Sequence, residues 1–297
     1  MPAGPRSKRF IRLLCGVLVA GGLLGLVPVQ ERIDGEKGIY GPVSDVIYMP
    51  SGKLLRRLSL GNEGLLAAIY WTRAVQYFGR RTLTKEARYG LLAPLLRITT
   101  ELDPHLLIAY RFGAIFLTEK PPQGAGQPQA ALELIRRGIV NNPAYWRLWQ
   151  DLGFIYYWNL KDYRRAAQAF LIGSRQPGAL FFMKAMAAKI LAQGGDPRTS
   201  YDIWMELYEH AENDQLRSNA EMHLTAIRAA MAMKQLDEIL ARFEHATGHK
   251  ARSFDDLVAA GWLRGIPVDS TGVPYQIGAD GKTALGPRSK VPMHLLE

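Results

Sequence analysis

Cysteine is almost absent from this chain of 297 residues, in which Cys15 is the single example. One cysteine excludes an intrachain disulfide framework and any zinc or iron–sulfur site that needs several thiolates. Because Cys15 lies inside a long apolar run, we also do not expect it to act as a catalytic nucleophile.

Sequence signatures of common enzymes are missing as well. The chain contains no G-x-S-x-G, P-loop, G-x-G-x-x-G or H-E-x-x-H sequence. His245 and His249 have a spacing that could hold a metal on one helix, but Gly248 is predicted to end that helix and no third ligand is evident. We therefore expect a protein that is not an enzyme, with no cofactor, no metal site and no small-molecule substrate.

Acidic residues are absent from the N-terminus, where Arg6, Lys8, Arg9 and Arg12 precede an uncharged run from Leu13 to Val29. A basic region followed by an apolar one is typical of a signal sequence. With Phe10 and Ile11, the apolar stretch approaches the roughly 20 residues that span a bilayer. We predict a signal anchor over residues 1–30, with the membrane span at residues 10–29. A cleaved signal peptide is the alternative, although no small-x-small cleavage site is obvious near residues 27–30.

The position of the basic residues predicts the topology. Positive charge on the N-terminal side of the span places residues 31–297 outside the cytoplasm. We therefore expect a single-pass protein of the bacterial inner membrane, with its body in the periplasm.

The four N-terminal cations leave +6 of the total formal charge of +10 for the rest of the chain. Basic pairs recur at residues 80–81, 136–137 and 164–165, on or next to predicted helices. Solvated helix faces are one interpretation, and contact with anionic lipid headgroups or an acidic partner is another. Nucleic acid is not expected as a partner in an exported location.

Two regions that differ in composition and hydrophobic pattern follow the predicted anchor. Residues 31–61 are rich in glycine and proline and predict an extended linker, with one short strand at residues 46–48. Residues 62–247 then read as successive amphipathic helices.

Residues 143–177 carry a spaced pattern of large and small side chains. Its first half has the spacing W-x2-L-G-x2-Y, and its second half places small, large and small residues before a proline. The residues are Trp149, Leu152, Gly153 and Tyr156, followed by Ala166, Phe170, Gly173 and Pro177. This pattern resembles the tetratricopeptide repeat (TPR), a 34-residue helical hairpin that must stack on others to bury its apolar face.

The preceding segment repeats this spacing, with a longer turn over residues 121–128 that is rich in Pro, Gly and Gln. The corresponding residues are Phe112, Gly113, Phe116, Ala131, Ile135, Gly138 and Pro143. Looser helix pairs are predicted at residues 65–78 with 85–102, at 181–193 with 199–212, and at 215–233 with 235–246. The resemblance therefore implies an all-α, TPR-like solenoid of about five hairpins.

Residues 248–297 form a different module, which is predicted to be a small α+β cap. A short helix should begin at Ser253, with Asp256 completing a capping box. A hairpin turn at Asp280-Gly281 is predicted between strands at residues 275–277 and 283–285.

The segment S-F-D-D-L-V-x-x-G-W-L-x-x-I-P-V-D-x-x-G-x-P-Y, which begins at Ser253, resembles the C-terminal part of type II secretion pseudopilins. Ser270 and Thr271 replace the proline and tryptophan that are usual in that family. Some members bind calcium in this region, but Asp269 and Asp280 alone are too few for such a site. The module either caps the last hairpin or docks into an assembly.

The predicted partner-binding groove follows from the positions that line the concave face of TPR proteins. These positions are occupied by Tyr110, Phe154 and Tyr157, with Arg111, Gln150 and Lys189 close by. Packing between hairpins is the alternative role for the aromatic residues. We predict a membrane-anchored scaffold that binds a protein or peptide, with a role in pilus or secretion-system assembly. The alternative is a structural subunit of an envelope filament or secretion complex that docks through its C-terminal module.

Overall fold

The computed structural model describes Pro28, residues 50–85 and residues 88–296. Except for Pro28, the predicted membrane span and the predicted strand at residues 46–48 lie outside the described residues. Among the residues that are described, no helix is both long enough and apolar enough to cross a membrane. The chain from Gly52 to Glu297 forms one compact unit.

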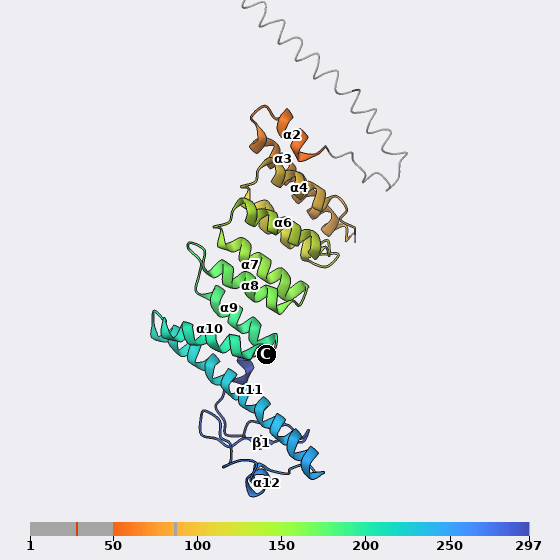
Figure 1. Cartoon of the computed structure of the whole chain (residues 1–297). Helices are drawn as coiled ribbons and strands as arrows, with labels where there is room; N and C mark the ends of the chain where they lie inside the picture. Colours follow the sequence, from red (N-terminus) through yellow and green to blue (C-terminus); the bar gives the residue numbers. More distant parts are fainter. Residues whose placement is uncertain (1–27, 29–49, 86–87, 297) are drawn as a thin grey trace, which may run out of the picture. The chain divides into compact units, whose positions relative to one another are not determined.

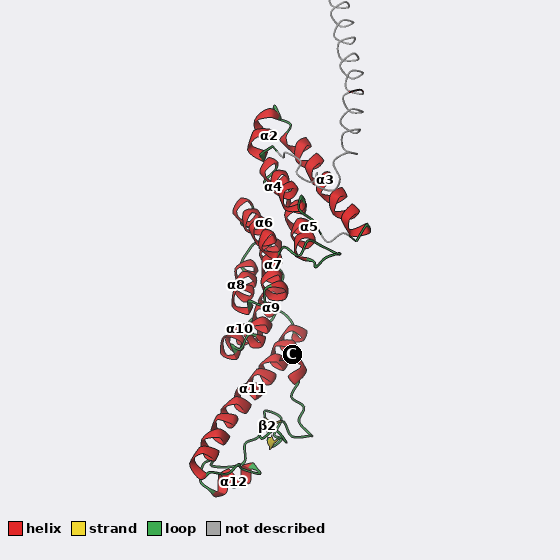
Figure 2. Ribbon diagram, turned by 90° about the vertical axis from the view of Figure 1, so that its right-hand side faces the viewer, coloured by secondary structure: helices red, strands yellow, loops and turns green. Residues whose placement is uncertain are grey.

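The described part of this unit is mostly helical, with eleven α-helices and one small two-stranded sheet (Figures 1 and 2). The helices up to residue 209 are α2 (Gly52–Leu58), α3 (Glu63–Leu83), α4 (Leu92–Leu102), α5 (Leu107–Thr118), α6 (Pro128–Asn141), α7 (Trp146–Phe154), α8 (Tyr163–Ser174), α9 (Phe182–Gln193) and α10 (Pro197–Glu209). A π-helical turn, η1 (Ile155–Asn159), continues α7.

Helices that follow one another along the chain pack as neighbours. The pairs α3–α4, α5–α6, α7–α8 and α9–α10 are in contact, and α4–α5, α6–α7 and α8–α9 link each pair to the next. Side chains between the layers are almost wholly buried, including those of Leu96, Tyr110, Ile135, Leu148, Phe170, Met183 and Trp204. The four predicted pairs between residues 65 and 212 thus form hairpins in the expected order.

Glycines let the paired helices approach closely. A Cβ atom built on Gly153 would lie 2.6 Å from the ring of Phe170, and one on Gly138 would lie 2.9 Å from the ring of Tyr110. Both distances are far inside ordinary van der Waals contact, so a side chain at either position would push the helices apart. The glycines of the spaced pattern therefore mark the places where helices cross.

The predicted fifth hairpin is wrong. Residues 214–247 form a single helix, α11 (Asp214–Thr247), instead of two helices that turn near residue 234. No glycine or proline interrupts this segment, and Lys234 at the predicted turn is a good helix former. The first half of α11 packs on α10, and the second half packs on the C-terminal residues, so both halves bury an apolar face without a turn.

The end of the predicted linker also differs, because residues 52–58 form α2 and pack against α4. Gly52 comes so close to the Glu101 side chain that a Cβ atom would overlap it. Periodicity could not identify this helix, which has only seven residues.

The C-terminal module folds as expected. It contains α12 (Phe254–Ala259), the antiparallel strands β1 (Gln276–Ile277) and β2 (Thr283–Ala284), and a final 3₁₀ turn, η2 (Met293–Leu296). The Asp256 carboxylate accepts hydrogen bonds from the N–H groups of Arg252 and Ser253, at 2.8 and 3.3 Å, so the predicted capping residue is confirmed. Gly248 ends α11 with a φ of 74°, also as predicted.

The module packs along the second half of α11. The shared apolar cluster consists of Leu236, Leu240, Phe243, Phe254, Leu257 and Tyr275. The last residues then return to α9 and the first half of α11, where η2 contacts both helices (the end marked C in Figures 1 and 2). The module therefore covers an apolar face that would otherwise lack a partner helix.

Candidate functional site

A groove of about 570 Å³ lies between the first helices of two neighbouring hairpins. One wall comes from α5 and the loop that follows it, and the other comes from α7 and η1. The lining residues are Arg111, Ala114, Ile115, Thr118, Glu119, Lys120 and Gln123 on the first wall, and Asp151, Phe154, Ile155, Trp158 and Asn159 on the second. This volume is in the range of about 300–1,000 Å³ that is typical of ligand sites.

A π-helical turn carries two aromatic side chains, Tyr157 and Trp158, that have different surroundings. In η1 the N–H of Leu160 donates to the carbonyl of Ile155, five residues earlier, at 3.2 Å. The wider turn rotates the residues that follow Phe154 relative to a regular α-helix. Trp158 lines the groove beside Phe154, four residues earlier, whereas Tyr157 does not line it and instead donates a hydrogen bond to Gln193 Oε1 at 2.6 Å.

Two stacked aromatic rings form the apolar part of the groove. Phe154 and Trp158 lie nearly parallel, with ring centroids 4.2 Å apart and an interplanar angle of 7°. Phe154 is also packed edge-on against the buried ring of Phe170, at 5.1 Å. Trp158 is 57% exposed, and Ile115 on the opposite wall is 49% exposed. The groove thus presents a large apolar surface that is held by the core beneath it.

An ion pair joins the two walls. Arg111 Nε lies 2.7 Å from Asp151 Oδ2, and Arg111 Nη2 lies 3.3 Å from Asp151 Oδ1. Burial raises the pKa of the Asp151 carboxyl, and the hydrogen bonds from Arg111 act against that rise. The same hydrogen bonds raise the pKa of Arg111. The two-point contact fixes α5 relative to α7, and the paired charges offer no net charge to a ligand.

The groove brings together two of the six residues predicted for partner binding, Arg111 and Phe154. Tyr110 has no exposed surface, since its ring packs against Gly138 and its hydroxyl accepts a hydrogen bond from Asn141. It therefore does not line the groove, contrary to its predicted position.

The remaining predicted residues are half-buried and lie elsewhere. Tyr157 turns toward α9, Gln150 lies on α7 outside the groove lining, and Lys189 lies on α9, where its charge acts on His223. Whether these residues contact a partner stays a prediction.

Several residues of the groove were not predicted. The groove is also lined by residues that were not selected from the sequence, among them Ile115, Glu119, Lys120, Gln123, Trp158 and Asn159. The available signal was the position of Trp158 four residues after Phe154, which places both aromatic side chains on one face of the helix.

The acidic residues of the C-terminal module hold the backbone. Asp269 is buried, and its carboxylate accepts hydrogen bonds from the N–H groups of Thr271 and Val273 and from the hydroxyls of Thr271 and Ser289. Asp280 accepts from the N–H of Lys282. In the described part of the chain, no group of three or more His, Cys, Asp or Glu side chains is arranged to hold a metal ion.

Comparison with known proteins adds no further constraint. No protein-family model matches the chain, and no curated protein matches it either.

Proposed function

We propose that this chain is a non-catalytic scaffold of TPR-like hairpins that binds a partner protein in the groove between α5 and α7–η1. The observation that carries this proposal is the exposed Phe154–Trp158 stack inside a groove of about 570 Å³. Exposed tryptophan on a rigid support is a typical anchor point of protein interfaces. The hydrogen-bonded Arg111–Asp151 pair holds the two walls in place before a partner binds, which lowers the ordering cost of association.

The mixed lining of the groove suits a peptide segment. Its apolar residues include Ile115, Phe154 and Trp158, and its polar residues include Glu119, Lys120 and Asn159. An extended segment could place one large apolar side chain against the Trp158 ring and satisfy its backbone groups at the polar edges. We place this scaffold in the envelope, with a role in pilus or secretion-system assembly, on the resemblances found in the sequence.

A pair of matched variants tests the groove. Ile115→Ala removes an exposed side chain from the groove, and Ile172→Ala removes an equivalent exposed side chain from α8, outside it. Proteins that co-purify with the full-length chain from detergent-solubilised native membranes are quantified by mass spectrometry. If a partner binds in the groove, less of it should co-purify with Ile115→Ala and with Trp158→Ala than with the wild type. The amount that co-purifies with Ile172→Ala should equal that of the wild type. If no co-purifying protein follows this pattern, the groove is not the binding site.

Membrane attachment is the second part of the proposal and has its own test. Residues 10–29 form the anchor, and the basic N-terminus keeps residues 31–297 on the periplasmic side. The intact mass of the mature protein should include Met1 or begin at residue 2, and the protein should stay with membranes after a carbonate wash. A mature N-terminus near residue 30 would show that the segment is a cleaved signal peptide.

A second candidate function is a structural subunit that docks through its C-terminal module. The observation that favours it is a set of exposed apolar side chains on the module: Trp262, Ile266 and Val268 are 38%, 47% and 55% exposed. Deleting the module would also uncover the apolar face of α11, so Ile266→Ser with Val268→Ser is the cleaner variant. Loss of envelope-complex assembly in this variant, with partner capture by the groove unchanged, would favour the docking role.

A further inference from the structure

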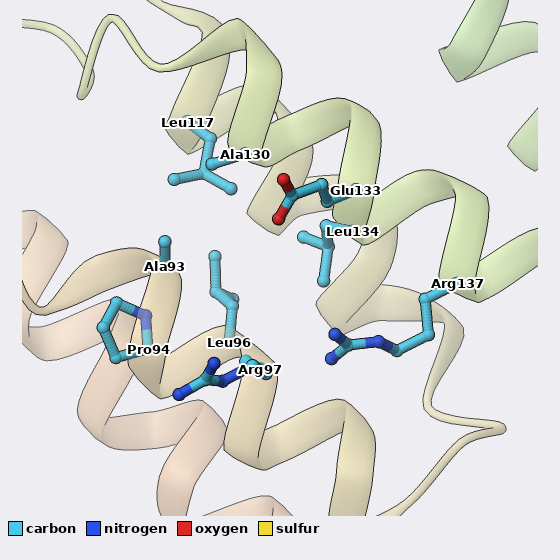
Figure 3. A pocket seen from close by; sticks show the side chains of 9 residues that line it. All are labelled: Ala93, Pro94, Leu96, Arg97, Leu117, Ala130, Glu133, Leu134 and Arg137. Carbon is cyan, nitrogen blue, oxygen red and sulfur yellow. The ribbon is translucent and has the colours of Figure 1, made fainter.

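A second, smaller cavity lies on the other helices of the hairpins, between α4 and α6 (Figure 3). Its volume is about 210 Å³, and its lining is largely aliphatic. Leu96, Leu117 and Leu134 converge on its centre from α4, α5 and α6, and Ala130 lies beside Leu117. The volume falls below the roughly 300 Å³ at which small-molecule sites begin. It therefore suits one bulky side chain better than a cofactor.

Two guanidinium groups lie on one side of this cavity. Arg97 reaches it from α4 and Arg137 from α6, and both head groups are on the same side in Figure 3. Arg137 is held by Thr100 Oγ1 at 3.4 Å and lies 3.9 Å from Glu101 Oε1. Arg97 is exposed and forms no ion pair with any residue that the structure describes. The cavity thus has an apolar floor beside a cationic edge with spare hydrogen-bond donors.

The charges around the cavity are predominantly positive. Helices α2, α4 and α6 carry six basic side chains and only two acidic ones, Glu101 and Glu133. Helix α2 packs directly against α4, and its Lys53, Arg56 and Arg57 are all exposed. Glu133 lies at the opposite side of the cavity from the two guanidinium groups in Figure 3. A ligand with negative charge is favoured at the Arg97–Arg137 edge.

We propose that this cavity binds an acidic segment of a partner protein, with one carboxylate paired to Arg97 and Arg137 and a neighbouring aliphatic side chain packed against the partly exposed apolar residues of the lining, Ala93, Pro94 and Ala130. Guanidinium groups suit a carboxylate because they can donate two parallel hydrogen bonds to it. The surplus of exposed cations on α2, α4 and α6 brings an acidic partner to this face and repels a basic one. This site is separate from the groove at Trp158, so the proposal does not rest on partner binding there.

The test measures binding of two labelled peptides to the full-length protein in neutral detergent, by fluorescence anisotropy at physiological ionic strength. The acidic probe is Gly-Ser-Leu-Asp-Leu-Glu-Gly-Ser, and the control probe has Asn and Gln in place of Asp and Glu. We expect the acidic probe to bind at least about tenfold more tightly than the control. Arg97→Gln should weaken the acidic probe by about tenfold, and Ala130→Leu, which fills the cavity, should weaken it similarly.

Arg164→Gln is the matched control, since it removes the same charge from an exposed position on α8, outside the cavity. It should change the affinity of the acidic probe by less than about twofold, because Arg164 does not line the cavity and salt weakens the effect of an exposed charge that does not contact the probe. Equal binding of the two probes, or equal losses in Arg97→Gln and Arg164→Gln, would overturn the proposal. Binding of labelled short-chain phosphatidylglycerol that depends on Arg97, without binding of the acidic peptide, would identify a lipid site instead. None of these outcomes affects capture by the Trp158 groove.

Discussion

Substituting Gly153 by alanine tests whether close helix crossings at glycine hold the hairpins together. The added Cβ atom would lie 2.6 Å from one carbon of the Phe170 ring and 2.7 Å from another, well inside ordinary contact. The ring is fully buried and packed edge-on by Phe154, so it has little room to move. The upper half of the usual overpacking cost, about 2–3 kcal/mol, therefore applies.

Alanine also has a higher helix propensity than glycine, which offsets about 1 kcal/mol of that cost. The net prediction for Gly153→Ala is a loss of about 1–2 kcal/mol in the free energy of unfolding. Gly79→Ala is the matched control, because Gly79 lies inside α3 and its added Cβ atom would have no neighbour within 4 Å. That variant should gain about 1 kcal/mol.

The assay is thermal unfolding of the full-length protein in neutral detergent, followed by circular dichroism at the helical band. For a domain of this size, 1 kcal/mol shifts the midpoint by roughly 2–4 °C, so the two variants should move in opposite directions. Adding Phe170→Leu to Gly153→Ala should recover part of the loss, because the two positions are in contact. If Gly153→Ala stabilises the protein as much as Gly79→Ala does, Gly153 is not a close helix crossing.

Three further predictions concern buried or part-buried polar groups. Burial lowers the pKa of His223 to about 4, so the folded state should lose at most roughly 3 kcal/mol of stability as the pH falls from about 6.5 to 4. Unfolding midpoints measured across this pH range should not show that loss in His223→Phe. Burial acts to raise the pKa of Asp269, but hydrogen bonds from Ser289 and from the residues that follow Asp269 outweigh burial and lower the pKa to about 2. The wild type should therefore be more stable than Asp269→Asn by its full margin above about pH 4, and this margin should shrink toward pH 2. Arg111→Gln removes the cation that is paired with the Asp151 carboxylate and should lower the free energy of unfolding, measured with denaturant, by about 1–3 kcal/mol. Adding Asp151→Asn to this variant should restore part of the loss.

Local signals in the sequence were sufficient for much of the fold. The cap at Asp256, the helix end at Gly248 and the turn at Asp280-Gly281 each depend on a few adjacent residues, and all three are found where predicted. The four hairpins between residues 65 and 212 follow from amphipathic periods separated by glycine and proline. The continuous α11 was missed, because its second half packs on residues far along the chain, and spacing alone does not reveal that partner.

The groove was predicted less well. The sequence pattern selected Tyr157, three residues after Phe154, although Trp158, four residues after it, also lies on the same face of a helix. In the structure Trp158 lines the groove and Tyr157 faces α9. Tyr110 was misplaced in a similar way, because the absence of a side chain at Gly138 lets its ring turn into the core.

Site-specific photocrosslinking from position 158 tests directly whether the groove binds a partner protein. A photoreactive phenylalanine analogue replaces Trp158 in the full-length protein, and the same analogue replaces Ile172 in a control, each in the native membrane. We expect a discrete crosslinked protein from position 158 that is absent from position 172 and is reduced by Ile115→Ala. Products of equal yield and identity from both positions, or none from position 158, would contradict the claim that this groove binds a partner.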